Sequence, residues 1–239
     1  DGRRVAAGVS ELGECFAAAE VIPPTLLTFE AWSFLRLGNR QKTAGCAAFP
    51  HPWAVLFLAS VGFWNFLGAG VFGFLINLPI VSYYEIGTAL TANHAHAAMM
   101  GVYGMLAVGL GLFCLRYLIP AARWPDRLAK ISFWSLNIGL AWMCFATLLP
   151  LGIAQLYESV DKSYFEARSL IYIANPTNSV LEWLRLPGDV LFILGGVLPF
   201  LWICWLGVRY RVTPLTLQEP QDVLFTEIRE PLVAGPRER

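Results

Sequence analysis

The sequence predicts an all-α membrane protein, a bundle of about five transmembrane helices. Of its 239 residues, 56% are hydrophobic and only 14% are charged, which is typical of polytopic membrane proteins. Several apolar runs are long enough to cross roughly 30 Å of hydrocarbon at about 1.5 Å per residue. Lysine and arginine also concentrate in alternate connecting segments, as they do between antiparallel spans. The formal net charge of zero, without a basic face, argues for membrane lipid rather than nucleic acid as the partner.

Five segments are predicted to span the membrane. The first begins with Pro23 and Pro24, at a helix start where proline is tolerated. Glycines in the second, among them Gly68 and Gly73, allow neighbouring helices to approach closely. The predicted spans are Glu20–Leu37, Trp53–Ile80, Gly87–Tyr117, Ile131–Gln155 and Pro187–Val208. Residues 1–19 stay unassigned, 20–211 form the transmembrane bundle, 156–186 are its longest polar connection, and 212–239 are an irregular tail.

The charges of the connecting segments predict the orientation. Basic side chains gather after the first and third spans and at the exit of the fifth, namely Arg36, Arg40, Lys42, Arg116, Arg123, Arg127, Lys130, Arg209 and Arg211. The connections after the second and fourth spans are acidic or nearly balanced. The positive-inside rule therefore places the basic loops in the cytoplasm. His51, between two prolines in the loop before the second span, is interpreted as a solvated loop residue.

Two of the three histidines, His94 and His96, lie inside the third span. An ionisable side chain in lipid is expensive unless it has a partner, so both are functional candidates. Residues i and i+2 of a helix are about 200° apart, and they point to nearly opposite faces. One metal ion held by both rings would need a spacing of three or four residues. The two imidazoles are therefore interpreted as ligands of two different groups that flank one helix.

Two haems fit this arrangement, because each iron takes a single proximal imidazole and each macrocycle needs an apolar wall. Small residues around the histidines would let flat rings approach the helix, namely Ala95, Ala97, Ala98, Gly101 and Gly104. The alternative is that both histidines only hydrogen-bond to neighbouring helices. The residues alone leave these two interpretations about equal.

Four motifs resemble the large subunit of bacterial nitric oxide reductase, in the haem–copper oxidase superfamily, and the quinol-dependent type is the most similar. They are FWNFLGAGVFGFLINLP at residues 63–79, YYEIGT at 83–88, NHAH at 93–96 and GVYGM at 101–105. The likeness extends over roughly Glu20 to Arg211. It implies a multi-pass protein of the bacterial inner membrane that converts two NO molecules to N2O and water in respiratory denitrification.

By this resemblance, His94 matches the axial ligand of the high-spin haem b3, and His96 matches one axial ligand of the low-spin haem b. The family also holds a non-haem iron with three histidines and a glutamate, and the second ligand of haem b lies upstream. Apart from His94 and His96, this chain contains one further histidine, His51. The resemblance therefore implies a C-terminal part of a longer enzyme, which needs its upstream half and a quinol or other electron donor, and which alone is inactive.

Three carboxylates are candidates for proton handling or haem contacts. Glu20 opens a segment that resembles the start of the family helix with a glutamate beside the binuclear centre. Glu30 is the rival on the same span, interpreted as a carboxyl on a polar seam. Glu85 directly precedes the histidine helix, where family members carry groups near the haem propionates; an ordinary loop carboxylate is the equal alternative.

Two other functions remain open at this point. A terminal oxidase of the same superfamily also has the His-x-His helix, although the motifs at residues 63–66 and 83–88 argue against it. A haem-free membrane protein with a structural or transport function is the alternative of a different class.

Overall fold

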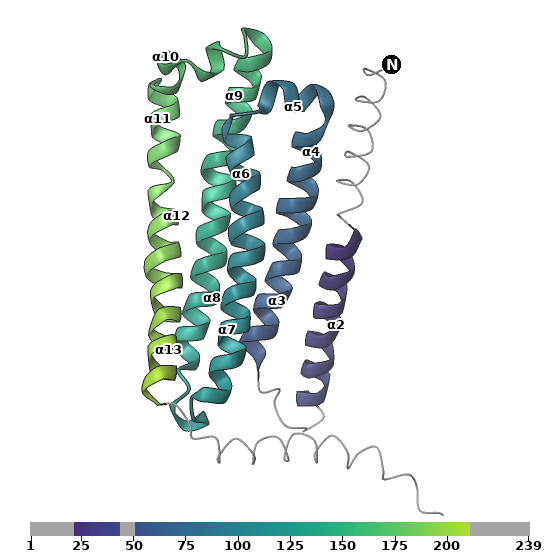
Figure 1. Cartoon of the computed structure of the whole chain (residues 1–239), viewed down its shortest axis with the longest axis vertical. Coiled ribbons are helices and arrows are strands. Elements are labelled where there is room, and N and C mark those ends of the chain that lie inside the picture. The colour runs from purple at the N-terminus through teal and green to yellow at the C-terminus, as the bar shows by residue number, and fades with distance from the viewer. Residues whose placement is uncertain (1–21, 44–50, 211–239) are drawn as a thin grey trace, which may run out of the picture.

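The computed structural model describes residues 22–43 and 51–210, and within them all regular structure is helical (Figure 1). Four rods are long and apolar enough to cross a membrane: Pro52–Asn77, Ala89–Leu118, Asp126–Asp161 and Pro176–Arg209. The helices are α2 (Ile22–Thr43), α3 (Pro52–Trp64), η1 (Asn65–Phe72), α4 (Gly73–Asn77), α5 (Pro79–Glu85), α6 (Ala89–Ala98), η2 (Met99–Gly104), α7 (Met105–Leu118), η3 (Ala121–Arg123), α8 (Asp126–Ala141), η4 (Trp142–Leu148), α9 (Leu149–Asp161), η5 (Glu166–Arg168), α10 (Leu170–Ile173), α11 (Pro176–Trp183), α12 (Leu186–Val190), η6 (Leu191–Val197) and α13 (Leu198–Arg209). The all-α membrane bundle is confirmed.

The first predicted span differs from the other four. Helix α2 packs against α3, but it is not among the described helices that are long and apolar enough to cross a membrane. Its 22 residues include Glu30, Arg36, Arg40 and Lys42. Four of the five predicted spans are therefore confirmed as helices long and apolar enough to cross a membrane, and α2 is a helix that packs beside them.

The long polar connection predicted between the fourth and fifth spans is mostly helical, so the rods on both sides of it are longer than the predicted spans. Helix α9 continues to Asp161, and the last rod begins at Pro176 instead of Pro187. The Asn175 side chain accepts a hydrogen bond from the Thr177 backbone N–H at 3.0 Å and caps this rod, and Pro176 occupies its first turn. Two ion pairs form at helical spacing in this region: Arg185 pairs with Asp189 at 3.1 Å, and Lys162 pairs with Glu158 at 2.6 Å.

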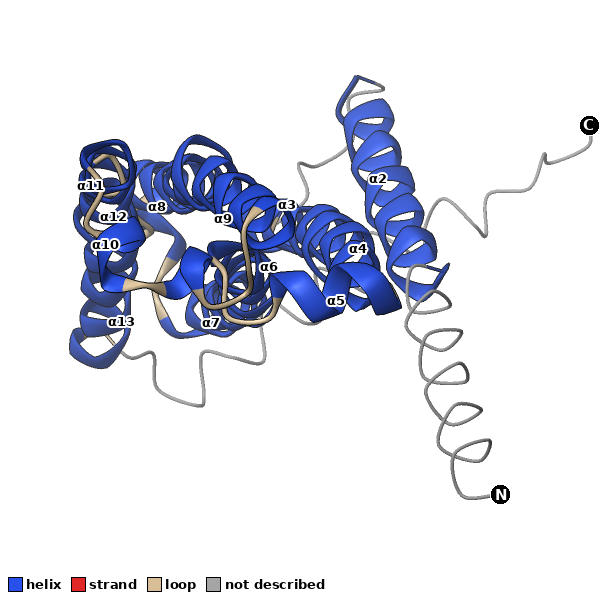
Figure 2. Ribbon diagram, turned by 90° about the horizontal axis from the view of Figure 1, so that it is seen from above, coloured by secondary structure: helices blue, strands red, loops and turns tan. Residues whose placement is uncertain are grey.

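Seen from above, the rod of α6, η2 and α7 lies between the rod of α3, η1 and α4 and the rod of α11 to α13 (Figure 2). Small residues bring the rods together. A Cβ atom on Gly68 would meet the Ala97 backbone at 2.7 Å, so only glycine fits there. Between α3 and α8, the Asn137 Oδ1 accepts hydrogen bonds from Ser60 at 2.6 Å and Trp64 at 3.0 Å. Such interhelical bonds satisfy polar groups where water is absent.

Each spanning rod contains one stretch of π-helix: η1, η2, η4 and η6. A π turn moves the hydrogen-bond register from i+4 to i+5 and leaves a carbonyl oxygen without its usual partner, and such turns are frequent at functional sites. The η1 stretch is relevant here because it contains Gly68, whose carbonyl oxygen faces the histidine helix.

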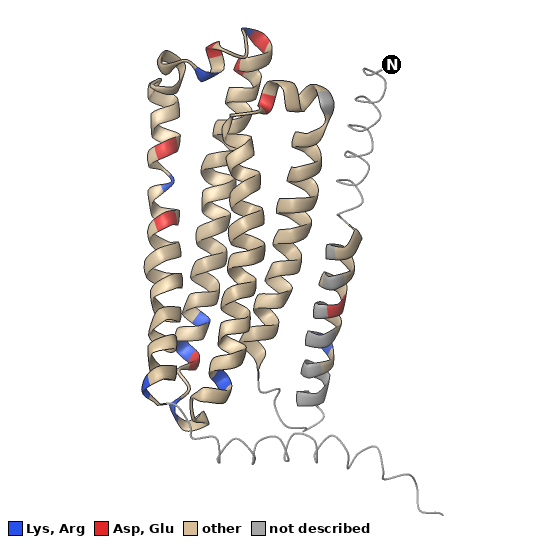
Figure 3. Cartoon of the chain, viewed as in Figure 1, with Lys and Arg blue, Asp and Glu red and all other residues tan. Residues whose placement is uncertain are grey.

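Most charges of the four spanning rods lie at their two ends, apart from Glu182, Arg185 and Asp189 within the last rod (Figure 3). One end carries Arg116, Arg123, Arg127, Lys130 and Arg209, with Asp126. The other end carries Glu85, Glu158, Asp161 and Glu166, with Lys162 and Arg168. This distribution agrees with the predicted orientation, in which the basic end is cytoplasmic.

Arg168 holds the outer end of the bundle together. Its guanidinium donates to the backbone oxygens of Tyr84 at 3.0 Å and Ile86 at 3.0 Å, where α5 turns into α6. It also donates to Ser159 Oγ at 2.8 Å and lies 3.6 Å from the centroid of the Tyr164 ring. One side chain thus ties the start of the histidine helix to the end of α9.

Replacing Arg168 with alanine should lower the free energy of unfolding by about 2 kcal/mol, because the carbonyl groups of Tyr84 and Ile86 lose a charged donor. Arg168→Lys should recover only part of this loss, because an ammonium group lacks the guanidinium fork. Thermal unfolding in detergent measures both. Lys162→Ala is the control, since Lys162 makes only an exposed i,i+4 pair with Glu158. Equal melting temperatures for the alanine variants would contradict this role of Arg168.

Candidate haem-binding site

The local sequence fixes where the histidine helix begins. Gly87 has φ = +77°, a left-handed conformation that favours glycine. Thr88 follows as the N-cap, and its side chain accepts a hydrogen bond from the Leu90 backbone N–H at 3.2 Å. Helix α6 therefore starts at Ala89 and carries His94 and His96 in its second turn.

The His94 ring points toward the rod that contains η1 and α4. Its Nδ1 lies 2.7 Å from the Gly68 carbonyl oxygen. A Cβ atom on Gly73 would meet the ring at 3.0 Å, so glycine provides the room for it. Beside the ring is a cavity of about 280 Å³, lined by Asn65, Ala69, Gly73, Asn77, His94, Ala98, Met99, Val102 and Tyr103. Because Met99 and Tyr103 are largely exposed, the described chain forms one wall of this site.

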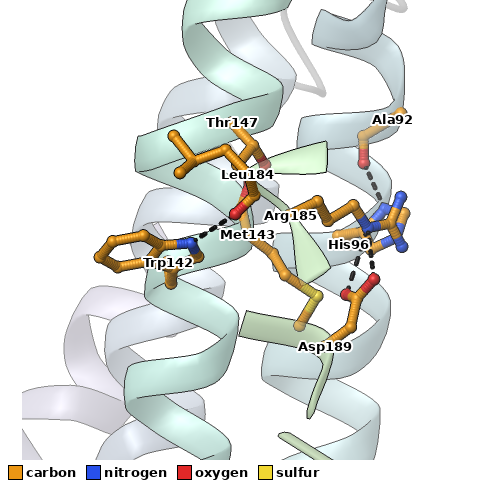
Figure 4. A network of polar contacts seen from close by, with 8 residues as sticks. All are labelled: Ala92, His96, Trp142, Met143, Thr147, Leu184, Arg185 and Asp189. Atoms are coloured by element: carbon orange, nitrogen blue, oxygen red, sulfur yellow. Dashed lines mark hydrogen bonds and ion pairs between the residues drawn. The ribbon is translucent and has the colours of Figure 1, made fainter. Parts of the chain in front are cut away.

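The His96 ring points the opposite way, toward the last rod. Its Nδ1 lies 2.7 Å from the Ala92 carbonyl oxygen, and its Nε2 lies 3.1 Å from Nη2 of Arg185. The same guanidinium pairs with Asp189, so Arg185 stands between a histidine and a carboxylate (Figure 4). A cavity of about 470 Å³ adjoins this pair, lined by Thr147, Leu148, Leu151, Leu181, Glu182, Trp183, Arg185, Leu186 and Asp189.

Arg185 reaches His96 because the last rod is interrupted at this point. Helix α11 ends at Trp183 and α12 begins at Leu186. Trp142 of η4 donates its indole N–H to the Leu184 carbonyl oxygen at 2.8 Å (Figure 4). This hydrogen bond fixes the interruption against the neighbouring rod and positions Arg185.

Both histidines present the same nitrogen for binding. A carbonyl oxygen only accepts, so the Nδ1 atoms of His94 and His96 must carry the proton in their contacts with Gly68 and Ala92. An arginine only donates, which likewise requires an unprotonated Nε2 on His96. Histidines that bind metals commonly donate their other N–H to a carbonyl in this way, which fixes the tautomer and the ring orientation. Each ring thus uses Nδ1 for a carbonyl oxygen, and Nε2 is the nitrogen that remains for another partner, which for His96 is Arg185 in this structure.

The predicted opposite-face arrangement is therefore found, because His94 contacts η1 and His96 contacts the α11–α12 junction. Of the small residues near the histidines, some line a cavity and others pack helices together. Ala98 lines the His94 cavity, as expected. Ala97 packs on Gly68 and Gly101 packs on Trp64, so these two residues hold helices together instead of facing a macrocycle.

The structure places the three carboxylates very differently. Glu85 is only 3% exposed and accepts a hydrogen bond from Thr91 Oγ1 at 3.0 Å, so it is not an ordinary loop carboxylate. Burial raises the pKa of Glu85, while the Thr91 hydrogen bond and the charge of Arg168 act in the opposite direction. Glu30 is exposed on α2. Glu20 lies outside the described residues.

The sequence-based reasoning missed Arg185 and Asp189 as neighbours of His96 because both were close to a presumed loop. The signal that would have found them is an Arg-x-x-x-Asp pair at helical spacing within an apolar segment, since intramembrane charges are usually functional. Across the described ranges, no group of three or more His, Cys, Asp or Glu side chains is arranged to hold a metal ion. A haem iron differs because it needs only one imidazole from each side.

Comparisons with known proteins identify the family of the chain. The sequence profile of the family described as Cytochrome C and Quinol oxidase polypeptide I matches residues 5–191. The chain is also similar to a subunit of the nitric oxide reductase of Stutzerimonas stutzeri, with 29% identity over 189 residues. That alignment covers 78% of this chain and 38% of the relative, so the chain spans well under half of that protein's length.

In the haem-free chain, ¹⁵N NMR of histidine-labelled protein should show both His94 and His96 with a protonated Nδ1, because each Nδ1 donates to a carbonyl oxygen, and His96 with an unprotonated Nε2, because Arg185 donates to it. The variants His94→Gln and His96→Gln assign the signals. An unprotonated Nδ1 on either ring would contradict the arrangement.

Proposed function

The chain belongs to the Cytochrome C and Quinol oxidase polypeptide I family, and from this we propose that it is the haem-binding part of a membrane nitric oxide reductase. The reaction is 2 NO + 2 H⁺ + 2 e⁻ → N2O + H2O, with quinol as the electron donor. The enzyme lies in the bacterial inner membrane. The observation that carries the proposal is the pair of opposed imidazoles on α6, each with Nδ1 bonded to a carbonyl oxygen.

Each histidine has a separate role in this proposal. His94 is the axial ligand of the high-spin haem b3, and His96 is one axial ligand of the low-spin haem b. Haem supplies one-electron chemistry whose potential depends on the axial ligand and its surroundings. The Gly68 and Ala92 carbonyl groups keep each Nε2 directed at its iron.

Arg185 is the residue that must adjust on haem binding. Its guanidinium and an iron would use the same Nε2 lone pair of His96, so Arg185 leaves that nitrogen when iron binds. The side chain has room to move because it lines the cavity of about 470 Å³. If Arg185 remained in this cavity, its positive charge would lie near the haem held by His96 and would favour the reduced iron.

The carboxylates supply protons in this proposal. Glu20 passes a proton to the reacting oxygen, which is general acid catalysis. Glu85 lies at the outer end of the histidine helix, near the haem propionates, and burial favours its neutral form.

The rest of the enzyme comes from outside this chain, which spans 38% of the length of its relative. The proposed non-haem iron and the second axial ligand of haem b belong to the upstream part. A terminal oxidase is the second candidate within the family, and it would reduce oxygen instead of NO. Turnover with each gas separates these two enzymes.

In the complete enzyme, His96→Gln should abolish the low-spin spectrum and spare CO binding at the high-spin haem, and His94→Gln should do the converse. The reason is that the two rings point to opposite sides of α6. Reduced-minus-oxidised and CO-difference spectra measure both. His51→Gln is the control, because His51 lies at the far end of the rod that carries Gly68. Loss of the same spectral component in both variants would refute the two-haem assignment.

Replacing Glu20 with glutamine keeps the shape of the side chain and removes its proton. Haem content should stay normal while NO turnover falls by about 10²-fold or more. Glu30→Gln is the matched control, because Glu30 is exposed on α2. Full activity of Glu20→Gln together with an inactive Glu30→Gln would mean that the proton passes through the other carboxylate.

A further inference from the structure

A groove between α3 and α7 runs from Leu106 toward the basic end of the bundle, and none of its lining residues lines the cavity beside His94. Its volume is about 220 Å³, and it is lined by His51, Ala54, Val55, Leu58, Leu106, Gly109, Leu110 and Phe113. Apart from His51, every lining side chain is apolar or absent. Leu110 and Phe113 are also largely exposed, so the groove is open along the hydrocarbon face of the rods.

The mouth of the groove is built differently from its floor. His51 packs on Phe113 with ring centroids 4.6 Å apart and on Tyr117 at 5.1 Å, so the prediction of a solvated loop histidine was wrong. Burial, followed by the charge of Arg116, lowers the pKa of His51. A second hollow adjoins the mouth and is lined by His51, Pro52, Trp53, Ala54, Leu112, Arg116 and Trp124. Tryptophan and tyrosine are typical of the headgroup level of a membrane.

Arg116 provides the charge at this mouth. Its guanidinium lies 5.2 Å from the centroid of the Trp124 ring. Within ranges 22–43 and 51–210, no carboxylate forms an ion pair with it. The nearby Asp126 instead accepts a hydrogen bond from the Trp53 indole at 2.6 Å. The mouth therefore combines the charge of Arg116 with the rings of Trp53, Tyr117 and Trp124, and its carboxylate, Asp126, is engaged by the Trp53 indole.

We propose that this groove binds an anionic phospholipid of the cytoplasmic leaflet, with one acyl chain in the groove and the phosphate beside Arg116. The basic end is the cytoplasmic end, where anionic lipids attract basic side chains near the membrane surface. The charge lies at headgroup depth and the apolar lining continues into the hydrocarbon, which is the layout of an amphiphile. This site does not depend on the proposed reductase activity.

The test measures binding of dioleoyl phosphatidylglycerol to the natural protein that contains this sequence, purified in detergent, by native mass spectrometry. Wild type should retain one phosphatidylglycerol in preference to phosphatidylcholine. Arg116→Gln should bind it about fivefold more weakly, since one basic side chain at a membrane surface contributes about 1 kcal/mol. Ala54→Phe should abolish retention by filling the groove. Arg116→Lys keeps the charge and should retain the lipid, which shows that the site tolerates substitution.

Lys130→Gln is the matched control, because it removes one exposed charge from the same end of the bundle without lining the groove. The proposal would be overturned if Lys130→Gln lost as much phosphatidylglycerol binding as Arg116→Gln. It would also be overturned if the wild type bound phosphatidylcholine as well as phosphatidylglycerol. A photo-reactive benzoylphenylalanine at Leu110 identifies the occupant in native membranes. A phospholipid adduct supports the site, whereas an adduct with another protein segment or a second copy overturns it.

Discussion

The arrangement of the site depends on one constraint, which is that two imidazoles two residues apart on a membrane helix cannot face the same side. Each ring must then find its own partner in a medium without water. His94 finds the Gly68 carbonyl on one neighbouring rod, and His96 finds Arg185 on another. The helix that carries them must lie between two rods, as α6 does (Figure 2).

In this bundle the same residues pack the helices closely and provide hydrogen-bond partners for the histidines. Gly68 both admits Ala97 and offers its carbonyl oxygen to His94, because the π-helical stretch η1 changes the local hydrogen-bond register. At the outer end, Arg168 donates hydrogen bonds to the backbone carbonyl oxygens of Tyr84 and Ile86, just before α6 begins. The histidine helix is thus held at its start by Arg168, and each histidine ring is oriented by a carbonyl oxygen. Such fixed orientation is typical of histidines that bind metals.

Much of this could be predicted from the sequence, because apolar run length and loop charge are strong signals in membrane proteins. Four spans, the charge segregation and the opposed histidines followed from them. The start of the last rod could not be predicted, because Glu182 and Arg185 resemble loop residues, and the pairing of Arg185 with Asp189 is visible only in the structure. The positions of Arg185 and His51 depend on contacts between residues far apart in sequence, with His96 and Phe113. Local patterns carry no information on such contacts.

The central claim is that one helix serves two haems, and the haem-to-protein ratio of the natural protein that contains this sequence tests it most directly. Haem extraction, combined with optical spectra of the reduced protein before and after CO, gives both the number and the kind of haem. The account predicts two b-type haems per polypeptide, of which one binds CO and one does not. A protein without haem, or with a single haem of one kind, would contradict it.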